Sequence, residues 1–235
     1  RPEAFQPLFS PWRPRTTFTA FSAHDAGHTD NLTTKGYFGA VCDGRYIYFC
    51  PIRDQQNRTS VHGRVLRLDT QANFKDPTAW QAYDASHTNG LHTAGFYGGA
   101  FDGRYIYFNP RDDGQVHHTR LLRYDTTGDF KNPDSWAAHD AQFPHSGQGL
   151  AFDGQYLYFC PGYTTAPNAN PADPGASLDG ETSGQILRYD TRASLKDPAS
   201  YQTFDATQIS ARATCYDGAL FDGRHIYFAP LSGGQ

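Results

Sequence analysis

One segment of eleven residues recurs four times along the chain and constrains the fold more than any other feature. It stands at 41–51 (VCDGRYIYFCP), 100–110 (AFDGRYIYFNP), 151–161 (AFDGQYLYFCP) and 220–230 (LFDGRHIYFAP). The aspartates of the four Asp-Gly pairs are spaced by 59, 51 and 69 residues, so about four periods of about 60 residues fill the 235 residues. A period of this length predicts a chain built from successive copies of one supersecondary unit.

Each copy has the pattern of four short strands. A first strand of small and apolar residues is followed by Asp-Gly, which predicts a two-residue hairpin turn with positive φ at both positions. The aromatic second strand ends at proline, a residue that cannot donate to a ladder. A third strand carries the blocks VLRLDT, LLRYDT and ILRYDT at 65–70, 121–126 and 186–191, and a fourth ends at Asp-Ala. With two glutamates and four lysines in the whole chain, helix formers are scarce, so we expect an all-β fold.

Four-stranded units at this period are typical of the blades of a β-propeller. We expect one propeller domain over 1–235, with four blades of four antiparallel strands at about 36–85, 95–141, 147–206, and 212–235 together with 1–26. The last copy stops after its second strand, whereas 16–26 resembles a fourth strand that ends in Asp-Ala, and 5–9 falls at the spacing of a third. We therefore expect the N-terminal strands to complete the last blade and close the ring. A five-bladed ring is the alternative.

These motifs resemble those of β-propeller repeat proteins. The blade count is similar to that of hemopexin-type domains, the length is similar to that of five-bladed tachylectin-type lectins, and the FDGRYIYF and LRYDT blocks resemble repeats of secreted or large microbial proteins. The resemblance covers nearly the whole chain and implies a fold. No functional motif of those families matches here, so no site residue is carried over.

Composition excludes several classes. A net charge of −4 disfavours a nucleic-acid binder. The sequence contains no run of about 18 apolar residues, so it predicts no membrane-spanning helix. The four cysteines vary between copies, which favours buried free thiols over a disulfide framework. Asn31 and Asn57 stand in Asn-x-Thr sequons, and the chain begins at Arg1 without an apolar leader. We therefore expect a mature product that is secreted or exposed at the cell surface.

The face that carries the longer loops is the expected functional face, because binding residues concentrate on loops held by a rigid scaffold. Seven of the ten histidines fall in these loops. The first strands begin nearest the axis, so the residues that open them should line the channel mouth, where the copies differ. The ligand-binding candidates are Tyr37, Phe38, His92, Phe96, Tyr97, His145, Gln148, Arg212, Tyr216 and Asp217.

Aromatic faces combined with amide and carboxylate groups suit a sugar, since rings stack on its C–H face and polar groups bind its hydroxyls. The same rings could instead plug the channel as core. We expect a non-catalytic, lectin-like module whose partner is a glycan or glycoconjugate.

A carbohydrate-active enzyme, either a polysaccharide lyase or a glycoside hydrolase, is the first alternative. Hydrolysis would need two carboxylates about 5–10 Å apart, and only Asp217 stands near the predicted mouth. A lyase could use Tyr97, His145 and Arg212. A protein-interaction platform is the second alternative. No motif identifies a cofactor, and a cation in the central channel, with His92 and His145 as nearest ligands, is a further expectation.

Overall fold

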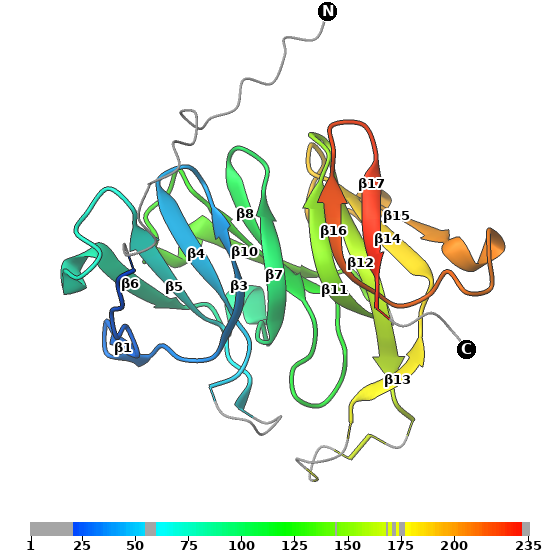
Figure 1. Cartoon of the computed structure of the whole chain (residues 1–235), viewed down its shortest axis with the longest axis horizontal. Coiled ribbons are helices and arrows are strands. Elements are labelled where there is room, and N and C mark those ends of the chain that lie inside the picture. The colour runs from blue at the N-terminus through cyan, green and yellow to red at the C-terminus, as the bar shows by residue number, and fades with distance from the viewer. Residues whose placement is uncertain are drawn as a thin grey trace, which may run out of the picture.

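The computed structural model describes residues 21–54, 60–143, 145–167, 169–170, 173 and 177–231. Within these residues the regular structure consists of antiparallel strands and short 3-10 turns, so the predicted all-β class is confirmed. None of the helical turns in this part of the chain is long and apolar enough to cross a membrane. Figure 1 shows the sheets side by side, with the hairpins of β7–β8 and β16–β17 at the top and the long loops at the bottom.

Two successive sheets have the same four-stranded order. The first is β3-β4-β5-β6 and the second is β7-β8-β9-β10, with every neighbouring pair antiparallel. The strands of the first are β3 (Tyr37–Cys42), β4 (Tyr46–Pro51), β5 (Arg64–Asp69) and β6 (Trp80–Asp84). Those of the second are β7 (Phe96–Phe101), β8 (Tyr105–Pro110), β9 (Arg120–Asp125) and β10 (Trp136–Asp140).

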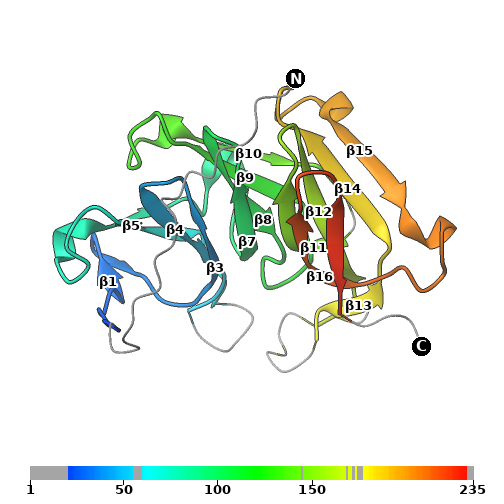
Figure 2. The ribbon, with the colours of Figure 1, turned by 45° about the horizontal axis from the view of Figure 1, so that its top comes forward.

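The third sheet has the order β11-β12-β14-β15, and β13 pairs with the extended end of β12. A two-stranded sheet of β16 and β17 follows, and a small β1–β2 hairpin precedes β3. The bounds are β11 (His145–Phe152), β12 (Tyr156–Thr165), β13 (Asp179–Thr182), β14 (Gln185–Asp190), β15 (Tyr201–Asp205), β16 (Tyr216–Phe221), β17 (Ile226–Pro230), β1 (His28–Thr29) and β2 (Leu32–Thr33). Figure 2 shows the sheets fanned out, as in a propeller, with β3, β7, β11 and β16 on the inner side.

Aromatic pairs join neighbouring sheets. Tyr83 of β6 stacks on Trp136 of β10 with 4.9 Å between ring centroids, and His139 of β10 packs on Tyr201 of β15 at 5.6 Å. In each pair the outer strand of one sheet lies against an aromatic ring of the next. The core therefore lies between the sheets, which sets their relative positions and those of the loops they carry.

The hairpins at Asp-Gly differ from the predicted two-residue turn. Gly44 has φ of 101°, whereas Asp43 has no positive φ. The carboxylate of Asp43 instead accepts hydrogen bonds from the backbone N–H groups of Arg45 and Tyr46, at 2.8 and 2.6 Å, and from Tyr48 Oη at 2.8 Å. The side chain thus supplies acceptors that a tighter turn would take from the backbone. The second hairpin has the same pattern around Asp102.

The predicted closure of the ring concerns the N-terminal segment, of which residues 1–20 lie outside the described residues. Residues 21–26 are described, form no strand, and place His24 against Trp80 of the first sheet. The number of blades, their boundaries and the closed ring stay predictions.

Candidate functional site

Two aromatic rings of adjacent inner strands stack on each other at the inner edge of the sheets. Phe38 of β3 and Tyr97 of β7 lie with 3.6 Å between ring centroids and 14° between ring planes, and Phe38 is 44% exposed. Both residues precede a glycine of positive φ, and the ladder shifts register there in each hairpin. Such a bulge re-aims a side chain out of the sheet. A Cβ on Gly39 would lie 3.3 Å from the Cα of Gly98, so the two strands approach closely enough for the rings to stack.

The equivalent residues of the next two inner strands differ in burial. Asp217 of β16 is half-buried, and Gln148 of β11 is 3% exposed. Burial raises the pKa of the Tyr97 phenol, and the charge of Asp217 raises it further, while Arg111 acts in the opposite direction. Of the predicted residues, Tyr97 is thus in ring contact with Phe38 and within electrostatic reach of Asp217.

The aromatic residues one step earlier on β3, β7 and β16 pack on the second strand of their own hairpin. Tyr37 packs on Phe49 with ring centroids 6.0 Å apart, Phe96 on Phe108 at 5.8 Å, and Tyr216 on Phe228 at 5.7 Å. Successive side chains of a strand alternate between its two faces, which accounts for this separation. We refer to Phe38 and Tyr97 together as the aromatic platform.

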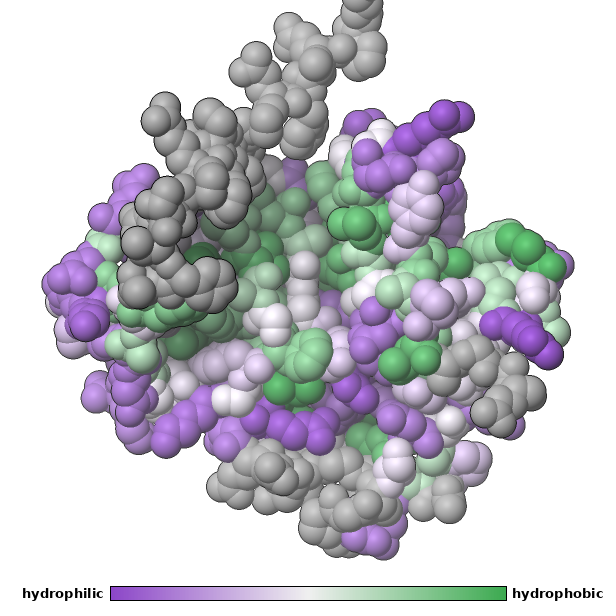
Figure 3. All heavy atoms as spheres, in the orientation of Figure 1, coloured by the Kyte–Doolittle hydropathy of each residue, from purple (hydrophilic) through white to green (hydrophobic). Residues whose placement is uncertain are grey.

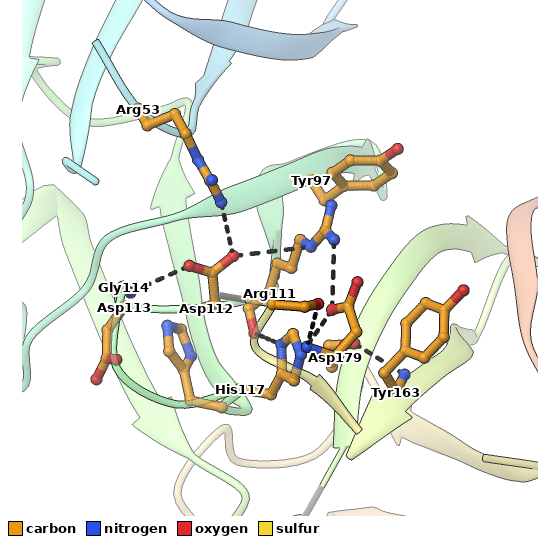
Figure 4. A network of polar contacts seen from close by, with 12 residues as sticks. Arg53, Tyr97, Arg111, Asp112, Asp113, Gly114, His117, Tyr163 and Asp179 are labelled. Carbon is orange, nitrogen blue, oxygen red and sulfur yellow. Dashed lines mark hydrogen bonds and ion pairs between the residues drawn. The ribbon is translucent and has the colours of Figure 1, made fainter. Parts of the chain in front are cut away.

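Arg111, in the loop after β8, connects the aromatic platform to a charged network. Its guanidinium carbon lies 4.8 Å from the ring centroid of Tyr97. Its Nε lies 3.7 Å from a carboxylate oxygen of Asp112, and its Nη2 lies 3.8 Å from one of Asp179. Figure 4 shows this guanidinium between the ring of Tyr97 and the two carboxylates. Nε is buried without a hydrogen-bond partner, so Arg111 retains an unused donor in the described structure.

Asp112 is the buried centre of this network, with a side chain only 2% exposed. Arg53, from the loop after β4, donates to it at 3.1 Å, and the backbone N–H of Gly114 donates to its other oxygen at 3.0 Å. A buried carboxylate is stable only when it is paired and hydrogen-bonded. These contacts therefore hold the loops of the first two sheets together.

His117 and Asp179 extend the network to the third sheet. Nε2 of His117 lies 3.0 Å from Asp179, its Nδ1 lies 3.3 Å from the carbonyl oxygen of Arg111, and its backbone N–H donates to Thr165 at 2.9 Å. The pKa of Asp179 lies below its ordinary value, mainly because the carboxylate accepts a hydrogen bond from His117. Burial raises this pKa, and the positive charge of Arg111 lowers it further. Loops from three sheets are thus fixed relative to one another beneath the aromatic platform (Figure 4).

The other three predicted residues lie apart from the aromatic platform or have other partners. His92 is exposed, and its ring packs on His87 with centroids 5.8 Å apart. His145 packs edge-on against Phe143, and burial and the nearby His117 lower its pKa. Arg212 is exposed between β15 and β16. No hydrogen bond, ion pair or ring contact joins Tyr97, His145 and Arg212 in the described part of the chain.

Arg53, Arg111, Asp112 and Asp179 were not predicted as site residues, although one sequence signal bears on the first three. In the first copy proline is followed by Ile52-Arg53-Asp54, and in the second by Arg111-Asp112-Asp113. The last aspartate of each triplet pairs with the first arginine of the third strand, at 2.6 and 2.8 Å, and therefore belongs to the repeat. The two preceding positions break the repeat.

Within the described residues, no three His, Cys, Asp or Glu side chains are grouped as a metal ion would require. No protein-family model and no curated protein matches the chain. Solved structures that resemble it include the extracellular domain of a hybrid two-component system from B. thetaiotaomicron, an alpha-L-arabinofuranosidase from Lactobacillus brevis, and the PQQ-bound aldose sugar dehydrogenase from Streptomyces coelicolor.

The sequence identities are 12%, 12% and 13%, and the TM-scores are 0.37, 0.33 and 0.35, in that order. The matches cover 86%, 81% and 85% of this chain. They cover 27%, 81% and 78% of the other chains, so this chain spans about a quarter of the first of them. At these values the likeness decides neither a family nor a function.

Proposed function

We propose that the chain is a non-catalytic carbohydrate-binding module and that the sugar stacks on the aromatic platform. The observation that carries this proposal is the stacked pair of Phe38 and Tyr97, with Phe38 44% exposed, on two bulged inner strands. Aromatic faces bind the C–H face of a pyranose, and rigid strands hold them at low entropic cost.

Polar groups around the aromatic platform suit hydroxyl groups. The Tyr97 phenol stays protonated well above neutral pH because burial and Asp217 raise its pKa, so it can donate and accept. Arg111, whose side chain is 19% exposed, adds donors, and Asp217 adds acceptors. Because Arg53 and Arg111 are already paired with Asp112 and Asp179, an uncharged sugar fits this environment better than an acidic one.

The carboxylates near the aromatic platform support binding over hydrolysis. Asp112 is buried and held by Arg53 and by the N–H of Gly114, and Asp179 is held by His117. A glycosidase needs one carboxyl group as proton donor and another as base or nucleophile. Both aspartates instead neutralise cations. We keep an extracellular location as part of the same proposal, since glycans concentrate there.

Titration calorimetry with a panel of neutral oligosaccharides tests the proposal. We expect Phe38→Ala to weaken binding by about fivefold or more, since stacking of a flat ligand such as a base on one aromatic ring is worth about 1–3 kcal/mol. Tyr97→Phe keeps the stack and removes one hydroxyl, so a smaller loss is expected. Ile209→Ala, at an exposed residue outside the sheets, is the matched control. A panel without a binder, or binding that Phe38→Ala leaves unchanged, would refute the proposal.

A further inference from the structure

An arginine recurs on the third strand of each of the three larger sheets, and two of the three copies hold it in the same way. In the first sheet, Nε and Nη2 of Arg67 both donate to Oε1 of Gln81, at 2.9 and 2.6 Å. In the third sheet, Nε and Nη2 of Arg188 donate to Oε1 of Gln202, at 3.0 and 2.6 Å. Each glutamine lies directly opposite its arginine on the outer strand. The repeat thus provides one oxygen acceptor for both donors of the guanidinium.

The second sheet keeps the arginine but has no such acceptor. Arg123 of β9 lies opposite Ala137 of β10, whose side chain ends at Cβ. Within the described residues the guanidinium of Arg123 makes no hydrogen bond and no ion pair, although Arg123 is half-buried. The other arginines of which this is true in that part of the chain, Arg192, Arg212 and Arg224, are exposed. Arg123 is therefore a half-buried cation whose donors no described side chain uses.

An aromatic ring fixes the plane of this guanidinium. Cζ of Arg123 lies 4.2 Å from the ring centroid of Tyr105, and Cζ of Arg67 lies 4.4 Å from that of Tyr46. The two side chains therefore have the same position in their sheets. Because Ala137 stands where the other sheets carry glutamine, an acceptor from outside the chain can reach Nε and Nη2 of Arg123.

Arg123 lies where the second sheet packs on the third. Tyr105 and Ala137 are partly buried against the apolar core between these two sheets. Burial raises the pKa of Tyr189 in the third sheet, and the positive charge of Arg123 lowers it. Apolar residues dominate between other sheets too, as Figure 3 shows for the recess between the first sheet and β16–β17. In such surroundings a cation is stabilised by an oxygen acceptor, most strongly by one with negative charge.

The nearby carboxylate of Asp102 is already engaged. Its charge also raises the pKa of Tyr189, so it acts on the same side chain as Arg123 does. Its oxygens accept from the backbone N–H groups of Arg104 and Tyr105, and from the hydroxyl of Tyr107, and form the hairpin turn. The charge of Arg123 is thus left for an acceptor that the described chain does not supply.

We propose that Arg123 binds the carboxylate group of a small organic acid, in the place that glutamine has beside the other two arginines. A guanidinium binds a carboxylate through two parallel N–H···O bonds in one plane. Tyr105 fixes that plane, so a planar carboxylate fits beside its ring, whereas a tetrahedral phosphate places oxygens outside the plane. The site lies on β9 and β10 and not on the inner strands that carry the aromatic platform, so it does not depend on sugar binding.

Nuclear magnetic resonance of the guanidinium N–H groups tests this site directly. The Nε–H signal of Arg123, assigned by its loss in Arg123→Lys, is followed while chloride is exchanged for acetate at constant ionic strength. We expect a saturable shift for Arg123 and none for Arg67 or Arg188, whose Nε groups already donate to glutamine. Inorganic phosphate at the same pH is a second probe, and it should bind less tightly than acetate.

Variants that exchange residues between the copies give matched controls. Ala137→Gln supplies Arg123 with the acceptor of the other sheets, so the acetate affinity should fall at least about tenfold. Gln81→Ala removes the acceptor from Arg67, which should then gain an acetate-dependent shift while Arg123 keeps its own. Gln202→Ala makes the same change beside Arg188, at an exposed glutamine whose truncation leaves the core intact.

Three results would overturn the proposal. A shift of Arg123 no larger than that of the exposed Arg212 would show that its guanidinium is hydrated and responds only to screening. An unchanged acetate affinity in Ala137→Gln would show that acetate binds elsewhere. Tighter binding of phosphate than of acetate would show that the site does not select a planar group.

Discussion

Arg53 and Asp112 occupy the same position in successive copies of the repeat, and the guanidinium of one lies 3.1 Å from the carboxylate of the other. In both copies the carbonyl oxygen at this position approaches a glycine of positive φ, Gly36 or Gly95, so the backbones superpose while the side chains differ in charge. A repeat of identical residues would place like charges together here. The ion pair is thus a contact between copies that only divergence of the repeat allows.

Arg53→Met should reduce the free energy of unfolding by about 2 kcal/mol, because it leaves the buried carboxylate of Asp112 with the more distant Arg111 as its cation. Arg53 is itself one-quarter exposed, so the loss stays below that of a fully buried pair. Urea unfolding at neutral pH measures the difference. Arg45→Met, at a pair whose arginine is 52% exposed, is the control and should cost much less. Equal losses for the two variants would contradict the assigned role of burial.

His118 should make the protein less stable in weak acid. Its Nε2 donates to the carbonyl of Ala94 at 3.0 Å while its Nδ1 accepts from the N–H of Arg120 at 3.2 Å, an arrangement that needs the neutral ring. Burial, assisted by Arg120, lowers its pKa to about 4. Since the unfolded chain has a histidine pKa of about 6.5, it takes up the proton first, and stability is lost as the pH falls from about 6.5 toward 4.

The contribution of this group is on the order of 3 kcal/mol between these pH values. His118→Gln keeps a donor for Ala94 without a titrating ring, so its free energy of unfolding should vary less steeply with pH. His87→Gln, at an exposed ring, should keep the slope of the parent chain. Parallel curves for His118→Gln and the parent chain would show that His118 does not carry the pH dependence.

The strands were predictable because each rests on a local pattern that recurs. Proline closes β4, β8 and β17 where the repeat has it, and Asp-Gly marks each hairpin. The predicted turn type was wrong because the observed hairpin depends on hydrogen bonds that the carboxylate of Asp43 accepts from the backbone. The expectation from the Asp-Gly pair considered only the backbone φ angles of the two residues. Closure of the ring stays a prediction, because the N-terminal segment on which it depends includes residues 1–20, which lie outside the described residues.

The candidate site was predictable only in part. Phe38, Tyr97 and Asp217 break the repeat at one position, and this divergence is visible in the sequence. Arg111 meets Asp179 because β13 pairs with β12, and nothing in the long segment before β13 indicates that pairing in advance. The face of a strand on which a side chain lies can be predicted from sequence, because successive side chains alternate between the two faces. Which loops come into contact depends on how the sheets pack against one another, and the sequence pattern does not show this.

The thiols should differ sharply in reactivity. Cys42 is exposed, whereas Cys50, Cys160 and Cys215 are buried, and burial raises the pKa of Cys50 and of Cys160 to about 12. The thiolate is the reactive form, so a disulfide reagent at neutral pH should modify one thiol in the native chain and four in urea. Cys42→Ser should bring the native count to zero; a count of two or more in the native chain would show that a sheet interface is open.

Gly149→Ala should be among the more damaging single substitutions in the inner strands. A Cβ there would lie 2.6 Å from the Cα of Gly218, so backbone and not a flexible side chain would have to move. We expect a loss of more than about 2 kcal/mol in the free energy of unfolding, measured in urea. Gly44→Ala is the control, since its Cβ would meet nothing within 4 Å and only the strain of φ at 101° remains, about 1 kcal/mol.

The same substitution also tests the aromatic platform, because Gly218 is the neighbour of Asp217 in β16. Moving β16 away from β11 changes the position of Asp217 relative to Tyr97, so Gly149→Ala should weaken sugar binding under conditions where the variant is still folded, whereas Gly44→Ala should not. If both variants bind as the parent chain does, Asp217 takes no part in the site, and the polar side of the aromatic platform is supplied by Arg111 and the Tyr97 hydroxyl.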